Sequence, residues 1–284
     1  MIAYLDGAWV EEERALIPVT DRGFLLSDGV FETALLFDGA YLRLREHLDR
    51  LCASAATLGI DAPSPDTLTP IIREIANRNG LTEGSLRITV TSGSASRRST
   101  VLVTIARRDP AWIAKAERGW KIITAATRRP SVAAVPSQLK ALGRTYALLA
   151  RREAVQAGVD DALLLTDAGI VCEGPSWNVF WRIDQTLHTP ALEAGVLGGV
   201  TRSMLIDLAG GCGLTVQQGF FERAMLDRAD EIFATMTSVG IVPIRQLDGR
   251  VLPPETPAAE ALRARYWAAV GAYCATAEKV GRSV

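Results

Sequence analysis

The sequence is poor in the residues on which several common enzyme classes depend. Its two histidines, His47 and His188, are too few for a metal site built on several histidines, and neither stands near a GxSxG motif. The four cysteines form no CxxC pair, so we expect no disulfide framework, no metal site and a reducing cytoplasm as the location. No GxxxxGK(S/T) loop is present, which argues against a P-loop nucleotide enzyme.

The sequence also lacks an excess of one charge and any long apolar run. Its 31 basic and 32 acidic residues leave a net charge of −1, whereas a general nucleic-acid binder normally has a basic excess. No apolar stretch reaches the roughly 18 residues of a membrane-spanning helix, and the first residues do not have the pattern of a signal peptide. We therefore expect neither nucleic acid nor membrane as a partner.

What the 284 residues do contain is ordinary for a globular protein. They are 48% hydrophobic and 22% charged, enough for one large or two medium domains. Short strands alternate with turns and helices, which predicts an α+β protein with two lobes. The stretch 107–110 (RRDP) marks a boundary, so we expect an N-terminal lobe over 1–110, a linker over 111–118 and a C-terminal lobe over 119–284.

Periodicity and turn residues predict the individual elements. Asp-Gly pairs at 6–7 and 38–39 stand between apolar runs and indicate hairpins. Apolar residues at helical spacing predict helices over 45–58, 67–79, 140–157, 200–209 and 257–278. Strands are expected over 30–37, 86–91, 101–106, 121–126, 161–166, 170–173, 179–183, 186–189, 231–234 and 241–247.

Lysine is rare, which narrows the search for a nucleophilic amine to Lys115, Lys121, Lys140 and Lys279. Lys140 lies in the nearly uncharged stretch 131–143. Burial lowers the pKa of a lysine and makes its amine a nucleophile, so Lys140 is a candidate catalytic residue. The alternative is an ordinary lysine at a helix start, with its ammonium group in water.

Four further features have both a binding and a structural interpretation. The glycines before Val200 and Thr201 either let a helix start bind an anion or form an ordinary cap. The hydroxyl-rich stretch 235–240 offers similar donors after a strand. Glu173 is either a buried carboxylate that pairs with a cationic group or a solvated turn residue. Arg50 either binds a phosphate with two N–H groups or forms a salt bridge along its helix.

Short segments between residues 6 and 249 carry a family resemblance: 21–23 (DRG), 27–33 (SDGVFET), 47–51 (HLDRL), Lys140, 173–174 (EG), 178–180 (NVF), 189–190 (TP), 197–202 (LGGVTR) and 230–233 (DEIF). In this order they resemble the class IV family of pyridoxal-phosphate enzymes, which contains branched-chain aminotransferases, D-amino-acid transaminases, (R)-selective amine transaminases and aminodeoxychorismate lyases. The resemblance implies a two-lobed fold type IV protein, with a smaller N-terminal α/β lobe and a larger C-terminal lobe containing a β-barrel-like sheet. It also implies a homodimer.

The resemblance implies that pyridoxal 5'-phosphate is the cofactor. Lys140 matches the lysine that forms a Schiff base with it and then moves the proton between Cα and C4′. Glu173 matches the carboxylate that pairs with the pyridine nitrogen, which makes the cofactor a better electron sink.

The resemblance also implies a set of phosphate-binding residues. Arg50 matches the arginine that binds the phosphate. Val200 and Thr201 match the backbone and hydroxyl donors at a helix start that bind the same group. Thr237, with the backbone of Met236, matches the donors on its other side.

Four residues are expected to line the substrate pocket from the first lobe: Leu26, Phe31, Thr33 and Leu35. Leu26 and Leu35 are expected to make it more apolar than in many relatives. Arg97 matches the arginine that holds the substrate carboxylate in D-amino-acid transaminases, and Arg98 or Arg87 is expected to supply a second positive charge. A solvated loop tip is the alternative for the Arg97–Arg98 pair.

Short sequence features distinguish the enzyme activities that occur in this family. Branched-chain enzymes carry a tyrosine five residues after the lysine, where this chain has Thr145 followed by Tyr146, and 140–144 (KALGR) is similar to the lyases. The pairs Glu173-Gly174 and Thr237-Ser238 favour a transaminase. We therefore predict a transaminase that moves an amino group from a D-amino acid or (R)-amine to a 2-oxo acid. The alternatives are an aminodeoxychorismate lyase, which forms 4-aminobenzoate and pyruvate, and a branched-chain L-amino-acid aminotransferase.

Overall fold

The structure, a computed structural model, describes residues 1–95 and 99–281. Residue contacts divide the chain into two units. The first unit comprises residues 1–108, 139–143 and 270–284, and the second comprises 109–138 and 144–269. This division differs from the single linker expected at 111–118, because two later segments of the chain also belong to the first unit.

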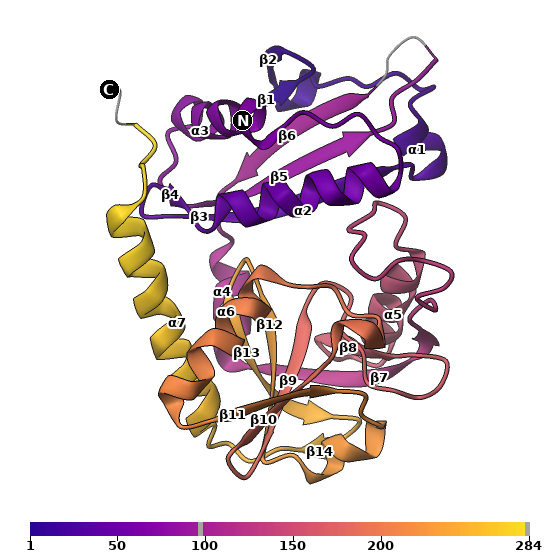
Figure 1. Cartoon of the computed structure of the whole chain (residues 1–284), viewed down its shortest axis with the longest axis vertical. Helices are drawn as coiled ribbons and strands as arrows, with labels where there is room; N and C mark the ends of the chain where they lie inside the picture. The colour runs from indigo at the N-terminus through magenta and orange to yellow at the C-terminus, as the bar shows by residue number, and fades with distance from the viewer. Residues whose placement is uncertain (96–98, 282–284) are drawn as a thin grey trace. The chain divides into compact units, whose positions relative to one another are not determined.

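The first unit is built on a six-stranded sheet in which neighbouring strands are antiparallel. The strand order is β2 (Ala8–Glu11), β1 (Ile2–Leu5), β6 (Thr100–Ala106), β5 (Gly84–Thr91), β3 (Gly29–Phe37) and β4 (Ala40–Tyr41). Its helices are α1 (Arg22–Leu26), α2 (Leu44–Thr57) and α3 (Pro65–Arg78), labelled in Figure 1. The hairpins expected at 6–7 and 38–39 are confirmed as β1–β2 and β3–β4.

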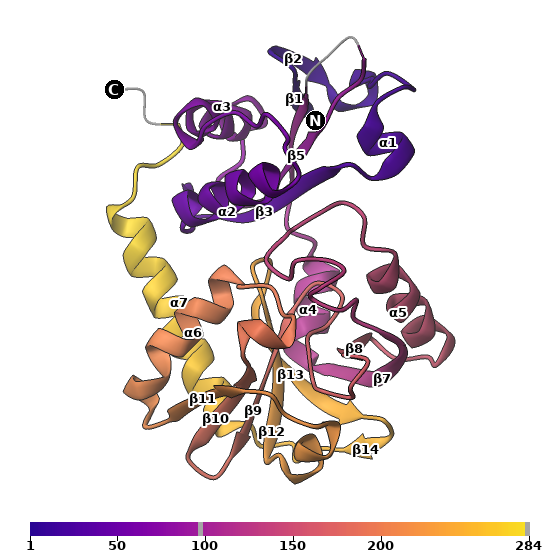
Figure 2. The same ribbon diagram turned by 45° about the vertical axis from the view of Figure 1, so that its right-hand side comes forward.

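One face of strand β3 packs on helix α2, which runs beside the strand in Figure 2. Val30 and Ala34 of that face are fully buried and belong to one apolar cluster with Leu48 and Leu51 of α2. Glu32 lies in the same row, between these two residues, and is also fully buried. A carboxylate in such a row is stable only when it is paired and hydrogen-bonded.

The second unit is built on an eight-stranded mixed sheet. The strand order is β11 (Thr215–Gly219), β10 (Thr186–Pro190), β9 (Asn178–Ile183), β12 (Glu231–Met236), β13 (Gly240–Leu247), β7 (Trp120–Arg128) and β8 (Asp161–Leu165), with β14 (Arg250–Val251) beside β13. A bridge between Ile170 and Glu222 joins the chain after β8 to the chain after β11. The two ends of the strand path therefore meet, as in a barrel.

The helices of the second unit are α4 (Pro110–Arg118), α5 (Thr145–Gln156), α6 (Val200–Ala209) and the first part of α7 (Pro257–Thr276). Short 3-10 helices lie at Glu12–Arg14 in the first unit and at Leu192–Ala194, Gly210–Cys212 and Arg223–Arg228 in the second. No helix in the described part of the chain is both long and apolar enough to cross a membrane.

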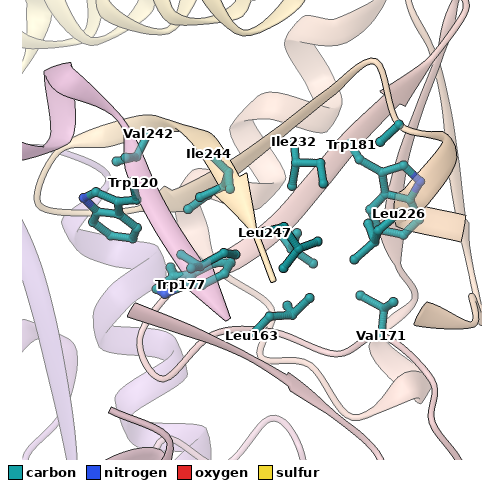
Figure 3. Packing of buried hydrophobic residues seen from close by; sticks show 14 of the residues in the cluster. Trp120, Leu163, Val171, Trp177, Trp181, Leu226, Ile232, Val242, Ile244 and Leu247 are labelled. Atoms are coloured by element: carbon teal, nitrogen blue, oxygen red, sulfur yellow. The ribbon is translucent and has the colours of Figure 1, made fainter. Parts of the chain in front are cut away.

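Tryptophans form the centre of the core of the second unit. Trp120, Trp177 and Trp181 are at most 3% exposed, and the rings of Trp120 and Trp177 meet edge to face with centroids 6.1 Å apart. Aliphatic side chains of β12 and β13, including Ile232 and Ile244, surround them (Figure 3). This packing fixes the strands from which the site residues of this unit extend.

The structure corrects three expected elements. The strand expected over 170–173 is replaced by isolated bridges at Ile170, Val171 and Glu173, because these residues pair with three different segments. Residues 111–118, expected to be a linker, belong to helix α4, because Pro110 occupies its first turn and the Asp109 carboxylate accepts a hydrogen bond from the N–H of Ala111. The helix expected over 140–157 starts only at Thr145, because Ala141 forms a β-bridge with strand β3 instead. Helix α1 and strand β11 were not expected at all.

Candidate active site

The backbone of Lys140 is hydrogen-bonded to helix α2 and to strand β3 of the first unit. Its N–H donates to Oγ of Ser54 on α2 over 3.2 Å, and its carbonyl accepts from the N–H of Phe31 on β3 over 3.0 Å. The N–H of Leu142 donates to the carbonyl of Gly29 over 2.9 Å. A Cβ at Gly29 would stand 2.7 Å from Cδ1 of Leu142, so glycine permits this approach. The half-buried Lys140 side chain therefore extends from a fixed backbone.

Arg50, on α2, is held by a buried carboxylate. Its Nε and Nη2 donate to Glu32, over 2.6 Å to Oε1 and 2.9 Å to Oε2, and Nδ1 of His47 lies 2.9 Å from Oε2. Burial raises the pKa of Glu32, but hydrogen bonds from His47 and Arg50 and the charge of Lys140 outweigh it and lower the pKa to about 2. Glu32 is therefore ionised at neutral pH and balances the charge of Arg50.

The ring of Phe31 lies next to two cations. Nζ of Lys140 is 4.8 Å from the ring centroid, and Cζ of Arg87 on β5 is 4.2 Å from it. Thr33 and Leu35 follow Phe31 on the same face of β3, because strand side chains alternate, and Thr33 stands opposite Arg87 in the strand register. Phe31 and Arg87 are therefore grouped with the lysine, whereas Leu35, further along the strand, is only 1% exposed.

Of the other three expected substrate residues, the structure describes one. Leu26 lies on α1 and is 62% exposed. Arg97 and Arg98 lie outside the described residues. Arg87, which was expected to supply a positive charge, lies over the same ring as Lys140.

In the second unit, Glu173 is a buried carboxylate and not a solvated turn residue, with 4% exposure. Its Oε2 accepts hydrogen bonds from Nδ2 of Asn178 over 3.2 Å and from the N–H of Leu197 over 2.9 Å. Its Oε1 lies 3.5 Å from Nε of Arg129. Asn178 also donates to the carbonyl of Leu197, so one amide holds both the carboxylate and the chain that leads to α6.

Arg129 connects Glu173 to Tyr146. Its Nη1 donates to the hydroxyl oxygen of Tyr146, and its Cζ lies 4.7 Å from the centroid of that ring. Its Nε also donates to the carbonyl of Gly195 over 3.0 Å. The tyrosine that follows Thr145 is thus joined to the buried carboxylate through one guanidinium group.

Helix α6 begins without a side-chain cap. A Cβ at its N-cap residue, Gly199, would stand 2.2 Å from Oδ1 of Asn178, so glycine lets the helix start lie against this amide. Val200 and Thr201 of the first turn are at most 9% exposed. The N–H groups of a first turn have no partner within the helix, and the helix dipole favours an anion beside them.

Met236 and Thr237 lie at the turn between β12 and β13. Met236 pairs with Gly240, which closes the turn, and the half-buried Thr237 follows it. Helix α6 packs against β12 within the same unit. The structure therefore places both expected donor segments on neighbouring elements.

Each unit thus holds part of the expected cofactor set: Lys140 and Arg50 in the first, and Glu173 with the donors of Thr201 and Thr237 in the second. The chemistry of these groups fits pyridoxal phosphate. An amine suits its aldehyde, a guanidinium and helix N–H groups suit its phosphate, and a buried carboxylate suits its pyridine nitrogen.

No role is predicted from sequence alone for Glu32, His47, Arg129 or Asn178. Glu32 had one readable signal, since it interrupts an alternating apolar row on a predicted strand. The HLDRL segment placed His47 and Arg50 one helical turn apart, on the same side of their helix. Arg129 and Asn178 had no comparable signal, because their partners lie in other elements.

Known proteins resemble this chain over most of its length. The profile of the family described as Amino-transferase class IV matches residues 29–247. A protein of Methanocaldococcus jannaschii named "Putative branched-chain-amino-acid aminotransferase" is 36% identical over 260 residues, or 89% of this chain and 90% of that protein. The D-alanine aminotransferase of Bacillus licheniformis is 28% identical over 90% of this chain and 92% of its own. The solved structure of the branched-chain aminotransferase of Thermoproteus uzoniensis with norvaline has a TM-score of 0.86 at 30% identity, covering 94% of this chain and 93% of that one.

Proposed function

Because this chain belongs to the class IV aminotransferases, a family of pyridoxal-phosphate enzymes with fold type IV, we propose that it transfers the amino group of an amino acid with a branched apolar side chain to a 2-oxo acid. The observation that carries this proposal is the ring of Phe31, which lies beside the Lys140 amine and the Arg87 guanidinium. An amino acid needs a cation for its carboxylate close to the amine that exchanges with it.

Bound pyridoxal phosphate supplies an aldehyde for amine exchange and a ring that stabilises negative charge next to it. Lys140 would hold the aldehyde carbon through Nζ and, once freed, would move a proton at that nitrogen. Glu173 would accept a hydrogen bond from the pyridine nitrogen, because hydrogen bonds from Asn178 and Leu197 hold its carboxylate in position.

The phosphate would be bound by Arg50, by the backbone and hydroxyl of Thr201 with Val200, and by the turn at Met236 and Thr237. Tyr146 would donate to the ring hydroxyl oxygen of the cofactor. Its link through Arg129 to Glu173 supports this role, and it stands one position after Thr145, where branched-chain enzymes carry a tyrosine.

The substrate would bind along the face of β3 that carries Phe31, Thr33 and Leu35. The half-buried apolar ring of Phe31 favours an aliphatic side chain, and Leu35 packs in the interior with 1% exposure. Arg87 would bind a carboxylate, which favours an amino acid over a simple amine. Leu26, Arg97 and Arg98 stay predictions for the substrate side.

The second candidate is a D-amino acid as donor, which the 28% identity to a D-alanine aminotransferase supports. The two candidates separate in a half-reaction. We would mix the full chain, loaded with pyridoxal phosphate, with L-leucine, L-valine, D-alanine, D-leucine or an (R)-arylalkylamine, without a 2-oxo acid. We would then follow the loss of yellow absorption and the oxo product.

We expect L-leucine and L-valine to bleach the cofactor and yield their 2-oxo acids. Bleaching by the D-series alone would replace the branched-chain proposal with the D-amino-acid one. Reaction with the amine alone would remove the carboxylate role of Arg87. Release of pyruvate from aminodeoxychorismate, with no bleaching by any amino acid, would make the chain a lyase.

Self-association is part of the same proposal. Several large apolar side chains of the first unit are exposed: Leu16, Val19, Phe24, Leu25 and Leu26. Exposed apolar residues in such number mark an interaction surface, and we propose a homodimer. Light scattering should give twice the mass of one chain, and a value equal to one chain would contradict it.

A further inference from the structure

The carboxylate of Glu32 is the acceptor at the centre of a buried group in the first unit. It accepts hydrogen bonds from Nε and Nη2 of Arg50, from Nδ1 of His47 and, over 3.1 Å, from the N–H of Thr33. Glu32 is fully buried, and the side chain of Arg50 is 14% exposed. A guanidinium has five N–H donors in a rigid plane, and this pairing uses two of them. Fixing those two fixes the direction of the whole plane.

His47 acts in this group as a neutral donor. Burial lowers the pKa of His47 in spite of the neighbouring carboxylate, so the imidazole carries one proton. Its Nδ1 faces Glu32, whereas its buried Nε2 has no hydrogen-bond partner among residues 1–95 and 99–281. The ionised carboxylate of Glu32 can only accept a hydrogen bond, so the single proton of the imidazole lies on Nδ1.

We propose that Glu32, supported by His47, is a positioning residue that holds the Arg50 guanidinium in the orientation in which it binds the cofactor phosphate. This inference rests on the proposed phosphate role of Arg50. Glu32 accepts hydrogen bonds from Nε and Nη2 of Arg50, and His47 restrains the same carboxylate, so the plane of the guanidinium has a fixed direction. Preorganised donors bind an anion more tightly than donors that must first be ordered.

The experiment compares two ligands that differ only in the phosphate. The dissociation constants of pyridoxal phosphate and of pyridoxal are measured with the cofactor-free full chain, for wild type and for Glu32→Gln, Glu32→Asp and Arg50→Met. A charge-assisted hydrogen bond corresponds to roughly 10–100-fold in affinity. We therefore expect Glu32→Gln to raise the dissociation constant of pyridoxal phosphate about tenfold or more. The dissociation constant of pyridoxal should stay unchanged. Glu32→Asp should recover part of the loss.

Two further variants test the donor atom of His47. The amide nitrogen of asparagine overlays Nδ1 of histidine, whereas that of glutamine overlays Nε2. His47→Asn should therefore keep the preference for the phosphorylated ligand, and His47→Gln should lose part of it. Asp49→Asn is the matched control on the same helix, because Asp49 is an exposed carboxylate paired with Arg45. It should change neither constant.

The outcomes separate this inference from the proposed function. If Glu32→Gln weakens both ligands equally, or neither, while Arg50→Met lowers only the affinity for pyridoxal phosphate, the positioning role is wrong and the phosphate role of Arg50 stands. If Arg50→Met leaves the ratio of the two constants unchanged, the phosphate role fails and the positioning role fails with it. If Glu32→Gln does not fold, equal ratios in His47→Asn and His47→Gln would also overturn the inference.

Discussion

The guanidinium of Arg129 lies against the carboxylate of Glu173, with Nε 3.5 Å from Oε1 and side chains that are 4% and 5% exposed. Two opposite charges buried together depend on each other, because either one alone would be a charge without compensation. Arg129 of this pair also donates a hydrogen bond from Nη1 to the hydroxyl oxygen of Tyr146.

We therefore predict that Arg129→Met lowers the free energy of unfolding by about 3–5 kcal/mol, since it leaves Glu173 buried without its cation. Urea unfolding of the wild type and the variant measures the difference. Arg152→Met is the control, because Arg152 is exposed on α5, and it should stay within about 0.5 kcal/mol of wild type. An equally small effect in both variants would show that the pair does not stabilise the second unit.

Lys140→Ala should reduce kcat for transamination by at least about a hundredfold, because the variant has no amine to hold the aldehyde or move the proton. The thermal unfolding midpoint should change little, since the backbone of residue 140 keeps its hydrogen bonds to Ser54 and Phe31. Lys121→Ala, at an exposed position of β7, is the control and should keep its activity. Full activity of Lys140→Ala would exclude the proposed role.

Glu32 should make stability depend on pH in the acid range. Its pKa falls from 4.5 to about 2 on folding, so the unfolded chain binds the proton more readily. The resulting stabilisation, of the order of 3 kcal/mol, is complete above pH 4.5 and is lost as the pH falls toward 2. Unfolding free energies of wild type and Glu32→Gln, measured along a pH series, should converge in that interval. Curves that stay parallel would contradict this shift.

Gly29→Ala should damage the site through the backbone. The new Cβ would stand 2.7 Å from Cδ1 of Leu142 and 2.9 Å from the carbonyl oxygen of Val90, which pushes the Lys140 segment away from β3. We expect a loss of about 1–3 kcal/mol in stability, together with a lower kcat.

Gly210→Ala is the matched control for this substitution. Gly210 has ordinary helical angles, and its added Cβ would meet nothing within 4 Å. Its stability should be equal to wild type or slightly higher, because alanine loses less backbone entropy than glycine on folding. Equal stability and activity of Gly29→Ala and Gly210→Ala would show that β3 does not position Lys140.

The sequence by itself determined the family, the α+β fold and the elements with strong local signals. Asp38-Gly39 closes the β3–β4 hairpin because these two residues adopt the positive φ angles that a tight turn requires. Helix α6 was predicted with its observed bounds, since its apolar spacing and preceding glycines are local features. The scarcity of lysine and the order of the short segments identified Lys140, Arg50 and Glu173 as candidates.

Only the tertiary structure decided how the candidates are held. Spacing alone placed Lys140 in a helix, but the hydrogen bonds to Ser54 and Phe31 place it beside a strand instead. No local pattern shows that Glu32 pairs with Arg50 or that Arg129 reaches both Glu173 and Tyr146. A buried charge must have a partner, but the packing of distant segments decides which residue that partner is.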